Sequence, residues 1–311
     1  MYLYMSESAR IRSNSKLEEV PEIDLVPFPM DVIGRGGEGT VYKCTLPGNL
    51  LKSDKETISV ACKEIESVQQ SFNTSEVHFL LSFTSLQHDN LVRFLGRGSK
   101  EHHRYLIMEL CPLSLADVID ECRKQEKFLD VRDFIKWVEG LTAALVFLGG
   151  LGFGHGDLKP QNFLIDANNN LKITDFGLTS RVDVHNHYCT TIKPGTARYM
   201  GPEKHMDFSM DRQALCLSDN WSYGICLWEM ISCQVPFGDV PDSALALHIG
   251  RNEKTSRPPI PAVCHCETLS IILRKCWNPN VYYRQSFEKL QTDIEDLKEE
   301  IESGIVRFNS E

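Results

Sequence analysis

The sequence lacks an excess of basic residues. Its 33 lysines and arginines are outnumbered by 43 aspartates and glutamates, which gives a formal net charge of −10 at pH 7. Proteins that bind nucleic acid through phosphate contacts need a basic surface, because each contact pairs a phosphate with a lysine or an arginine. The charge therefore argues against a nucleic-acid partner, although it says little about the fold.

Long apolar runs are missing as well. The longest, residues 141–153, is too short to span a bilayer and is interrupted by Gly149 and Gly150. Residues 1–13 are polar and show no apolar core of a secretory signal. The sequence also has no internal repeat and no low-complexity block. We expect from this a cytoplasmic protein with no membrane span in this chain.

Cysteine, by contrast, is plentiful, and the 11 cysteines are spread from Cys44 to Cys276. An odd number in a chain of 311 residues does not resemble a disulfide framework and favours reduced, buried thiols. One alternative is a zinc site formed by Cys264, His265, Cys266 and Cys276. Their spacing lacks the two paired Cys-x-x-Cys units that are typical of such a site.

The first part of the chain is rich in strand patterns. Residues 1–26 are charged and serine-rich, and prolines follow, which predicts a flexible tail. Residues 32–109 indicate mostly strands, with one helical stretch at 74–87. We therefore predict a small β-rich lobe over residues 27–109 and a hinge at 110–112.

The rest of the chain has helical spacing. Predicted helices cover residues 115–122, 130–148, 219–233 and 286–302. The last one carries a single apolar stripe, which favours packing on its own lobe over a coiled coil. We predict a larger helical lobe over residues 113–303, followed by a short tail at 304–311. Ligands often bind where two such lobes meet.

A glycine-rich segment, GRGGEG at 34–39, fits G-x-G-x-x-G with Gly34, Gly36 and Gly39. Glycine is needed where backbone amides approach phosphate oxygens without an intervening side chain. A dinucleotide-binding fold would require a helix directly afterwards, but TVY at 40–42 is β-branched or aromatic. The pattern favours a strand–turn–strand flap over a nucleotide, and the alternative is a plain glycine-rich turn.

Lys63 ends the apolar segment VACK at 60–63. After a glycine-rich flap, such a lysine is typical of a cation that holds the α- and β-phosphates, whereas an isolated one usually lies at the surface. The lysine needs a carboxylate to fix its position, and Glu76 is the sole acidic residue on the following predicted helix. Glu76 lies one turn before the usual place, where Phe79 stands, so a solvated charge is the alternative.

The segment HGDLKPQN at 155–162 places a carboxylate, Asp157, and an amide, Asn162, in one loop. Asp157 would accept the proton of an attacking hydroxyl, and Asn162 would hold Mg²⁺. DFG follows at 175–177, and its Asp175 would ligate Mg²⁺ that bridges the β- and γ-phosphates. Mg²⁺ prefers oxygen ligands and uses few protein carboxylates, which suits this set. Asp-Phe-Gly alone is only a turn signal, but the order and spacing make the pattern specific.

In this order, the motifs from Gly34 to Arg284 resemble those of the eukaryotic protein kinase superfamily. The resemblance implies an α+β, bilobal protein kinase fold, ATP in the cleft, Mg²⁺ and a protein substrate. It also leaves room for a regulatory protein partner. The nucleotide contacts that it implies come from Ile33, Gly34, Gly36, Gly39, Val41, Ala61, Lys63, Glu76, Met108, Glu109, Cys111, Leu164 and Asp175.

The resemblance gives some of these residues particular roles. Met108 would stand at the back of the adenine pocket, and Glu109 and Cys111 would offer backbone hydrogen bonds to adenine.

It also implies two supporting interactions in the large lobe. Glu203, at the end of a segment that resembles an activation segment, would form a buried ion pair with Arg284. Asp219 would brace the loop around Asp157 through backbone amides.

Two positions favour transfer to serine or threonine. Lys159, two residues after Asp157, and Thr196 resemble serine/threonine kinases, whereas tyrosine kinases usually carry alanine or arginine near Lys159. A lysine there can neutralise charge on the transferring phosphoryl group.

Further runs point to a subgroup. HDNLV at 88–92, GTARYM at 195–200 and WE at 228–229 resemble the tyrosine-kinase-like group. The long interval between Glu203 and Asp219 is similar to type II receptor kinases of the transforming growth factor beta family.

A further departure from the kinase pattern is Gly156, which stands where an arginine usually precedes the catalytic aspartate. That arginine normally meets a phosphate on the activation segment, so a phosphate on Thr190 or Thr191 would lack its main cationic partner. We expect constitutive competence or control by a partner.

Two interpretations of function follow. Lys63, Asp157, Asn162 and Asp175 are all present, which favours an active kinase. The alternative is a pseudokinase that acts as a nucleotide-binding scaffold or signalling adaptor. The early position of Glu76 supports it, as does Glu38 at the flap tip, where an aromatic residue is common.

Overall fold

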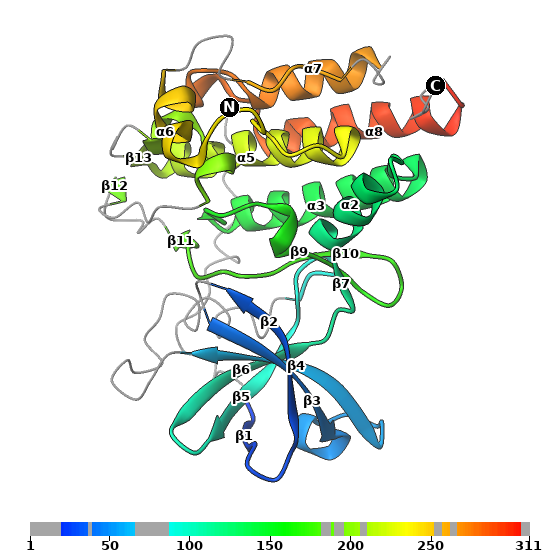
Figure 1. Ribbon diagram of the computed structural model, residues 1–311, viewed down its shortest axis with the longest axis vertical. Coiled ribbons are helices and arrows are strands. Elements are labelled where there is room, and N and C mark those ends of the chain that lie inside the picture. The colour runs from blue at the N-terminus through cyan, green and yellow to red at the C-terminus, as the bar shows by residue number, and fades with distance from the viewer. Residues whose placement is uncertain are drawn as a thin grey trace, which may run out of the picture.

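The computed structural model describes residues 20–36, 39–65, 87–181, 188–189, 196–205, 210–251, 257–261 and 266–305. A sheet occupies one end of the molecule and helices the other (Figure 1). The chain crosses between them after β6 (His103–Glu109), just before the short strand β7 (Leu113–Ser114). This architecture confirms the predicted α+β, bilobal fold.

Six strands form the sheet of the small lobe, in the order β1-β5-β6-β4-β3-β2. They are β1 (Glu22–Asp24), β2 (Met30–Gly36), β3 (Gly39–Pro47), β4 (Thr57–Ile65), β5 (Phe94–Lys100) and β6. A 3₁₀ turn, η2 (Gly48–Leu51), follows β3. Alternate side chains point to one face and are buried there, among them Cys44, Leu46, Val60, Cys62, Tyr105 and Ile107. Such alternation of buried and exposed side chains is expected of a sheet that has one face packed against a core and the other face toward solvent.

Strand β1 lies inside the stretch predicted to be a flexible tail. It runs parallel to β5, and the Arg97 N–H donates to the Pro21 carbonyl at 2.8 Å. Ile23 and Leu25 are buried in the small-lobe core. The prediction of a tail is therefore wrong for residues 22–25, because two apolar side chains among charges and prolines suffice to add an edge strand.

The larger helices build the other lobe. They are α2 (Leu115–Lys124), α3 (Val131–Gly150), α5 (Arg212–Ser232), α6 (Asp242–Gly250), α7 (Glu267–Cys276) and α8 (Phe287–Glu302), with the short α4 (Pro202–His205) before α5. The four predicted helices of this lobe are confirmed, although α5 begins earlier than expected. Helices α6 and α7 were not predicted. The helix predicted at 74–87 lies almost entirely outside the described residues.

Local sequence explains where these helices begin. Ser114 caps α2, and its side chain and that of Asp117 bond reciprocally to backbone amides. Asp130 caps α3 by accepting from the Arg132 N–H at 2.8 Å. The apolar stripe of α8 is buried in the large-lobe core: Phe287, Leu290, Ile294, Leu297 and Ile301. Helix α8 therefore packs on its own lobe, as its stripe predicted.

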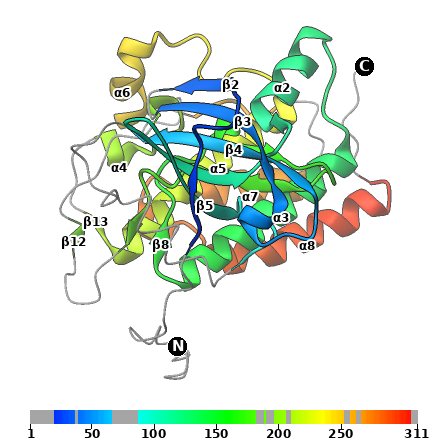
Figure 2. The same cartoon turned by 90° about the horizontal axis from the view of Figure 1, so that it is seen from below.

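Short elements connect the longer helices after the hinge. Strands β9 (Phe163–Ile165) and β10 (Leu171–Ile173) form a hairpin to which β7 adds, and β8 (Phe153–Gly154) pairs with β11 (Ser180–Arg181). The remaining elements are β12 (Tyr188–Cys189), β13 (Met210–Asp211), η3 (Pro160–Asn162), η4 (Ala197–Tyr199) and η6 (Val281–Tyr283). Seen from below, the sheet lies across the end of the helical lobe (Figure 2). Among the described helices, none combines the length and apolarity needed to cross a membrane.

Candidate active site

The glycine-rich segment is a hairpin formed by β2 and β3. Gly34 lies opposite Val41, and Gly36 lies opposite Gly39. Gly39 has φ +124°, and a Cβ there would lie 2.5 Å from the Glu64 carbonyl oxygen, so a larger residue would be strained and would clash. The strand that follows confirms the strand–turn–strand prediction and excludes a dinucleotide-binding helix. Residues 37–38, which include Glu38, lie outside the described residues, while the neighbouring Ile33 is exposed.

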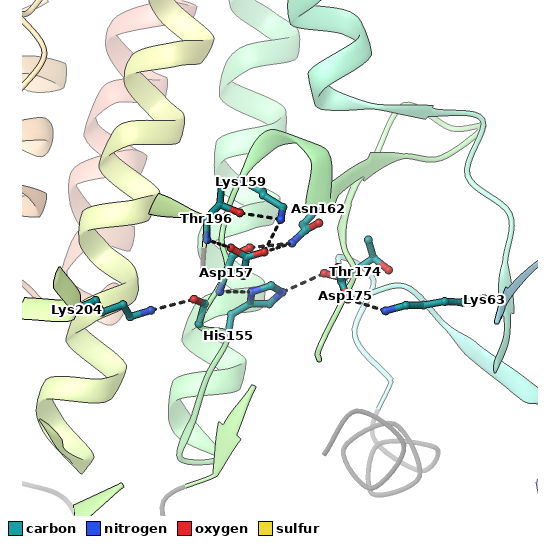
Figure 3. A network of polar contacts seen from close by, with 10 residues as sticks. Lys63, His155, Asp157, Lys159, Asn162, Thr174, Asp175, Thr196 and Lys204 are labelled. Carbon is teal, nitrogen blue, oxygen red and sulfur yellow. Dashed lines mark hydrogen bonds and ion pairs between the residues drawn. The ribbon is translucent and has the colours of Figure 1, made fainter. Parts of the chain in front are cut away.

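Lys63 lies on β4 opposite Val41 of β3, and Ala61 of the same strand lies opposite Met108 of β6. The Lys63 side chain is buried, and its Nζ donates to Asp175 Oδ1 at 2.7 Å. The structure thus joins the small-lobe lysine to the aspartate of the DFG motif (Figure 3). Glu76, to which we assigned the pairing with Lys63, lies outside the described residues.

Asp175 follows β10 in an unusual backbone conformation. Its φ of 67° falls in the left-handed region, which non-glycine residues adopt rarely and mostly at functional sites. The neighbouring Phe176 is buried and packs edge-on against His155, with ring centroids 5.4 Å apart. Backbone conformation and ring packing together direct the Asp175 carboxylate toward Lys63.

His155 is buried and serves the structure of its loop. Its Nδ1 accepts from the Asp157 N–H at 3.2 Å, and its Nε2 lies 3.0 Å from the Thr174 carbonyl oxygen. A carbonyl oxygen can only accept, so Nε2 carries the proton and Nδ1 does not. His155 is therefore a neutral imidazole that ties the loop at 155–162, hereafter the HGD loop, to the residue before Asp175.

Asp157 lies at the centre of the HGD loop and is largely buried (Figure 3). The Thr196 N–H donates to its Oδ1 at 2.8 Å, and Lys159 Nζ donates to its Oδ2 at 2.5 Å. Lys159 Nζ also donates to Thr196 Oγ1 at 2.9 Å. The structure therefore brings together the three residues in which the sequence places a base and its specificity determinants.

The surroundings of Asp157 favour its charged form. Burial opposes ionisation, but the hydrogen bond and positive charge of Lys159 and the donors of Thr196 outweigh it, so the pKa of Asp157 lies below its ordinary value. At neutral pH the side chain is consequently a carboxylate that can accept a proton.

Asn162 supplies the amide of the site from η3. Its Nδ2 donates to the Asp157 carbonyl at 2.8 Å and approaches Asp157 Oδ2 at 3.3 Å. The Thr174 N–H donates to the Asn162 backbone carbonyl at 3.0 Å, which ties Asn162 to the segment that leads to Asp175. With the amide nitrogen used inside the loop, the side-chain oxygen of Asn162 is the atom left for a cation.

The donor set fits a hard divalent cation. One amide oxygen and one carboxylate are oxygen ligands of the kind that Mg²⁺ uses while it retains waters or phosphate oxygens. Within the described residues, no group of three or more His, Cys, Asp or Glu side chains could hold a metal by itself. The predicted zinc alternative includes residues 264–265, which lie outside the described residues.

Two interactions expected from the resemblance are present in the large lobe. Asp219 accepts from the N–H groups of His155 at 2.6 Å and Gly156 at 3.0 Å. Glu203 and Arg284 form a bidentate ion pair with distances of 2.6 and 2.7 Å, and the Arg284 side chain is fully buried. Both predictions are confirmed.

The connection between the lobes is also held by polar contacts. The Glu109 N–H donates to the Arg93 carbonyl at 3.0 Å, and Lys172 Nζ lies 3.0 Å from Glu109 Oε1. Cys111 is half-buried, and burial raises the pKa of its thiol to about 12. Leu164 lies on β9 between Lys172 and Ser114 of the neighbouring strands. Sequence reasoning missed Lys172, although a lysine inside the otherwise apolar strand β10 was a signal.

A second buried group was also missed. Glu229 on α5 accepts from the Tyr199 hydroxyl at 2.7 Å, and Arg123 approaches its other oxygen at 3.4 Å. Burial raises the pKa of Glu229 to about 7, although Tyr199 and the positive charge of Arg123 oppose the shift. The WE pair at 228–229 was noted only as a subgroup marker, so its position behind η4 was not foreseen.

Comparison with known proteins agrees with this geometry. The sequence profile of the family described as protein tyrosine and serine/threonine kinase matches residues 29–294. This match covers most of the chain and shows that the chain belongs to the protein kinase family.

Individual relatives differ in their described activities. The chain is 28% identical over 276 residues to human tyrosine-protein kinase Fer, covering 87% of this chain and 31% of that protein. It is 29% identical over 310 residues to a probable serine/threonine-protein kinase of Dictyostelium discoideum, covering 95% and 20%. It is also 26% identical over 280 residues to the inactive tyrosine-protein kinase kin-32 of Caenorhabditis elegans, covering 88% and 30%. The chain thus spans about a third or less of the length of these relatives.

Proposed function

We propose that this chain is a protein serine/threonine kinase that transfers the γ-phosphoryl group of ATP to a hydroxyl of a protein substrate. The observation that carries the proposal is the convergence of Lys159 and Thr196 on the Asp157 carboxylate. A general base must lie within hydrogen-bond reach of the proton that it accepts and must be ionised at the working pH. The surroundings of Asp157 meet the second requirement.

ATP would bind between the lobes. The backbone of Glu109 and Cys111 would bond to the adenine beside Met108, and apolar contacts would come from Ile33, Val41, Ala61 and Leu164. The backbone amides of the hairpin that contains Gly34, Gly36 and Gly39 would approach the phosphates. Lys63 would hold the α- and β-phosphates, and its ion pair with Asp175 supports this role because both groups already lie at one place.

Asn162 and Asp175 would hold Mg²⁺ through the Asn162 side-chain oxygen and the Asp175 carboxylate. When bound, Mg²⁺ supplies positive charge that offsets the negative charge of the phosphates during transfer. The protein itself orients these ligands: Asn162 is held by Asp157, and Asp175 is held by Lys63.

Transfer would then proceed with Asp157 as the base. The substrate hydroxyl oxygen forms a bond to the γ-phosphorus, the bond from that phosphorus to the β–γ bridging oxygen breaks, and ADP leaves. The hydroxyl proton passes to Asp157. Lys159 lies beside the base, where its charge offsets the negative charge on the transferring group.

The choice of serine or threonine over tyrosine rests on Lys159 and Thr196. Lys159 is bonded both to Asp157 and to Thr196, so the segment that ends in η4 is joined to the base through one cation. The runs at 88–92, 195–200 and 228–229 support a place in the tyrosine-kinase-like group, and the interval from Glu203 to Asp219 supports a similarity to type II receptor kinases of the transforming growth factor beta family. We propose residues 27–303 as the extent of the kinase domain. A cytoplasmic, reducing location fits the buried thiols of Cys44, Cys62 and Cys226.

The test is a radiolabelled-ATP assay with Mg²⁺ and a generic protein substrate, with Asp157→Asn as the matched control. We expect incorporation in the wild type that falls by about 1,000-fold or more in the variant, because the base is lost. Acid hydrolysis of the product should yield phosphoserine or phosphothreonine. Phosphotyrosine alone would overturn the serine/threonine assignment but not the kinase.

Equal incorporation by both proteins would favour the scaffold alternative, which the resemblance to the inactive kinase kin-32 keeps in view. In that case ATP should still bind, and binding should weaken in a Lys63→Met variant. Calorimetric titration of ATP into both proteins measures this directly.

A further inference from the structure

Lys204 is a buried cation that the proposed chemistry does not use. It lies on the short helix α4, immediately after Glu203, and only 8% of the residue is exposed. Its Nζ donates to the Gly156 carbonyl oxygen at 2.9 Å, which joins two segments 48 residues apart in the sequence. In Figure 3, Lys204 contacts the HGD loop from one side, and Lys63 contacts Asp175 on the other side of that loop.

The partner of this ammonium group is unusual. Burying a charged group is unfavourable unless it is paired, and most buried lysines pair with a carboxylate. Within the described residues, the hydrogen bond of Lys204 goes to a neutral backbone carbonyl. The charge therefore acts on the peptide group that joins Gly156 to Asp157, the proposed base.

That peptide group cannot be fixed by a side chain of its own residue. Gly156 has φ +89°, and a Cβ there would lie 2.7 Å from the Leu178 carbonyl oxygen. Glycine is thus required by the fold, but glycine also leaves the backbone free to rotate. The orientation of the peptide must be imposed from outside.

Lys204 donates to the carbonyl of this peptide at 2.9 Å, and the N–H of the same peptide, that of Asp157, donates to His155 Nδ1 at 3.2 Å. Asp219 holds the preceding peptide, because it accepts from the Gly156 N–H at 3.0 Å. A cation on a carbonyl oxygen polarises its peptide and strengthens the donor at the other end of the same peptide, which is the Asp157 N–H.

We propose that Lys204 is a positioning residue for Asp157: from α4 it fixes the Gly156–Asp157 peptide and thereby holds the base in its orientation. The inference rests on the proposed kinase function. In this proposal, Lys204 restrains the HGD loop from outside, because Gly156 has no side chain that could do so.

The test compares Lys204→Met with Lys204→Arg. Methionine matches the lysine side chain as far as Cε and removes the charge and the donors, whereas arginine keeps both. We expect kcat to fall at least tenfold in Lys204→Met, with KM for ATP within twofold of the wild type. Lys204→Arg should recover most of kcat. If Lys204 only stabilised the fold, its replacement by methionine would lower the melting temperature but would not lower kcat while leaving KM for ATP unchanged.

Lys275→Met is the matched control. Lys275 on α7 pairs with Asp293 of α8 at 2.8 Å, far along the chain from the HGD loop. Hydrogen exchange of peptides that cover residues 155–158 gives a second measurement, and it should accelerate in Lys204→Met but not in Lys275→Met. If Lys204→Met does not fold, Lys204→Gln replaces it, with the same expectation.

The outcomes separate the two proposals. If wild-type turnover does not exceed that of Asp157→Asn, the proposed function fails and this inference fails with it. If the wild type is active and Lys204→Met matches it in kcat, the inference alone is overturned. Unchanged loop exchange in an active but slowed Lys204→Met would also overturn it, since the loss would then have another origin.

Discussion

The HGD loop and the nucleotide-facing edge of the small lobe are held in different ways. In the HGD loop, backbone and side-chain groups are bonded from α5 by Asp219, from α4 by Lys204 and from the segment before η4 by Thr196. On the small-lobe side, Lys63 forms an ion pair with Asp175, and the segment before β5 bonds to the strand before Asp175, where the Val92 N–H donates to the Ile173 carbonyl at 2.9 Å. The base is thus held from three elements of the large lobe, whereas strand β4 of the small lobe is joined to Asp175 through the Lys63 side chain.

This difference fits the separate tasks of the two lobes in the proposed reaction. A base must be placed within a fraction of an ångström, which favours a loop with many hydrogen bonds. A lobe that admits and releases a nucleotide must be able to move, which favours few bonds. Variants in the small lobe and variants around the HGD loop should therefore differ in which kinetic or stability parameter they change.

Among the variants that test this comparison, the largest effect is expected for Lys63→Met, which removes the ion pair with Asp175. We expect kcat/KM to fall by about 100- to 1,000-fold, because one preorganised positive donor near the transferring charge is lost. Steady-state kinetics measure this, with Lys43→Met, an exposed position on the adjoining strand β3, as control. A loss of less than about fivefold would contradict the assignment of Lys63 and erase the contrast between the two sides.

Asp219→Asn tests the other side. Asparagine has one acceptor oxygen, so one of the two N–H groups of His155 and Gly156 would face an amide donor in a buried place. We expect the free energy of unfolding to fall by about 2–4 kcal/mol, measured by urea denaturation. Among folded molecules, kcat should fall while KM for ATP stays the same. A change in KM alone would show that the HGD loop is not independent of nucleotide binding.

Glu229→Gln tests how the stability of the large lobe depends on pH. The pKa of Glu229 is raised from 4.5 to about 7 in the folded state, so between these values the folded protein binds more protons than the unfolded chain. Stability that depends on this group is therefore present at low pH and declines as pH rises through 7, by on the order of 2–3 kcal/mol.

Glutamine cannot ionise and should not show this decline. The melting temperature of the variant, relative to the wild type, should rise between pH 5 and pH 8, as measured by thermal shift at several pH values. A constant difference would mean that Glu229 titrates near its ordinary pKa and that Tyr199 and Arg123 compensate for its burial.

The smallest effect is expected for a Thr190→Ala/Thr191→Ala double variant, whose positions lie outside the described residues. Gly156 supplies no cation to bind a phosphate in this segment, so turnover should change by less than tenfold, or about 1.4 kcal/mol in the barrier. A larger loss would show that the active arrangement of the HGD loop depends on phosphorylation of Thr190 or Thr191 and not on its hydrogen bonds alone. Phosphatase treatment of the wild type gives an independent comparison.

Much of this site could be predicted from sequence because its motifs are local. The residues of the glycine hairpin, of the DFG motif and of the pair Asp157 and Asn162 each lie within a few positions of one another. The order of these motifs along the chain also predicted the bilobal fold. The ion pair of Glu203 with Arg284 was predictable only through resemblance, since 81 residues separate the two.

What sequence reasoning missed depends on contacts between distant segments. Nothing near Lys204 in the sequence indicates that its ammonium group reaches Gly156, and nothing near Glu229 indicates burial behind Tyr199. Strand β1 was missed because an edge strand is stabilised by its neighbour and not by its own length. Such partners become visible only when the chain is folded.

The thiol of Cys111 has a consequence for inhibitor chemistry. The backbone of Cys111 is proposed to bond to adenine, so its thiol is the one that an electrophilic adenine mimic would be designed to reach. Because the pKa of this thiol is raised from 9.0 to about 12, its thiolate population is about a thousandfold smaller than that of an ordinary cysteine. Acrylamide-type compounds should therefore alkylate Cys111 slowly at neutral pH, and selective ligands for this pocket are better sought among reversible binders.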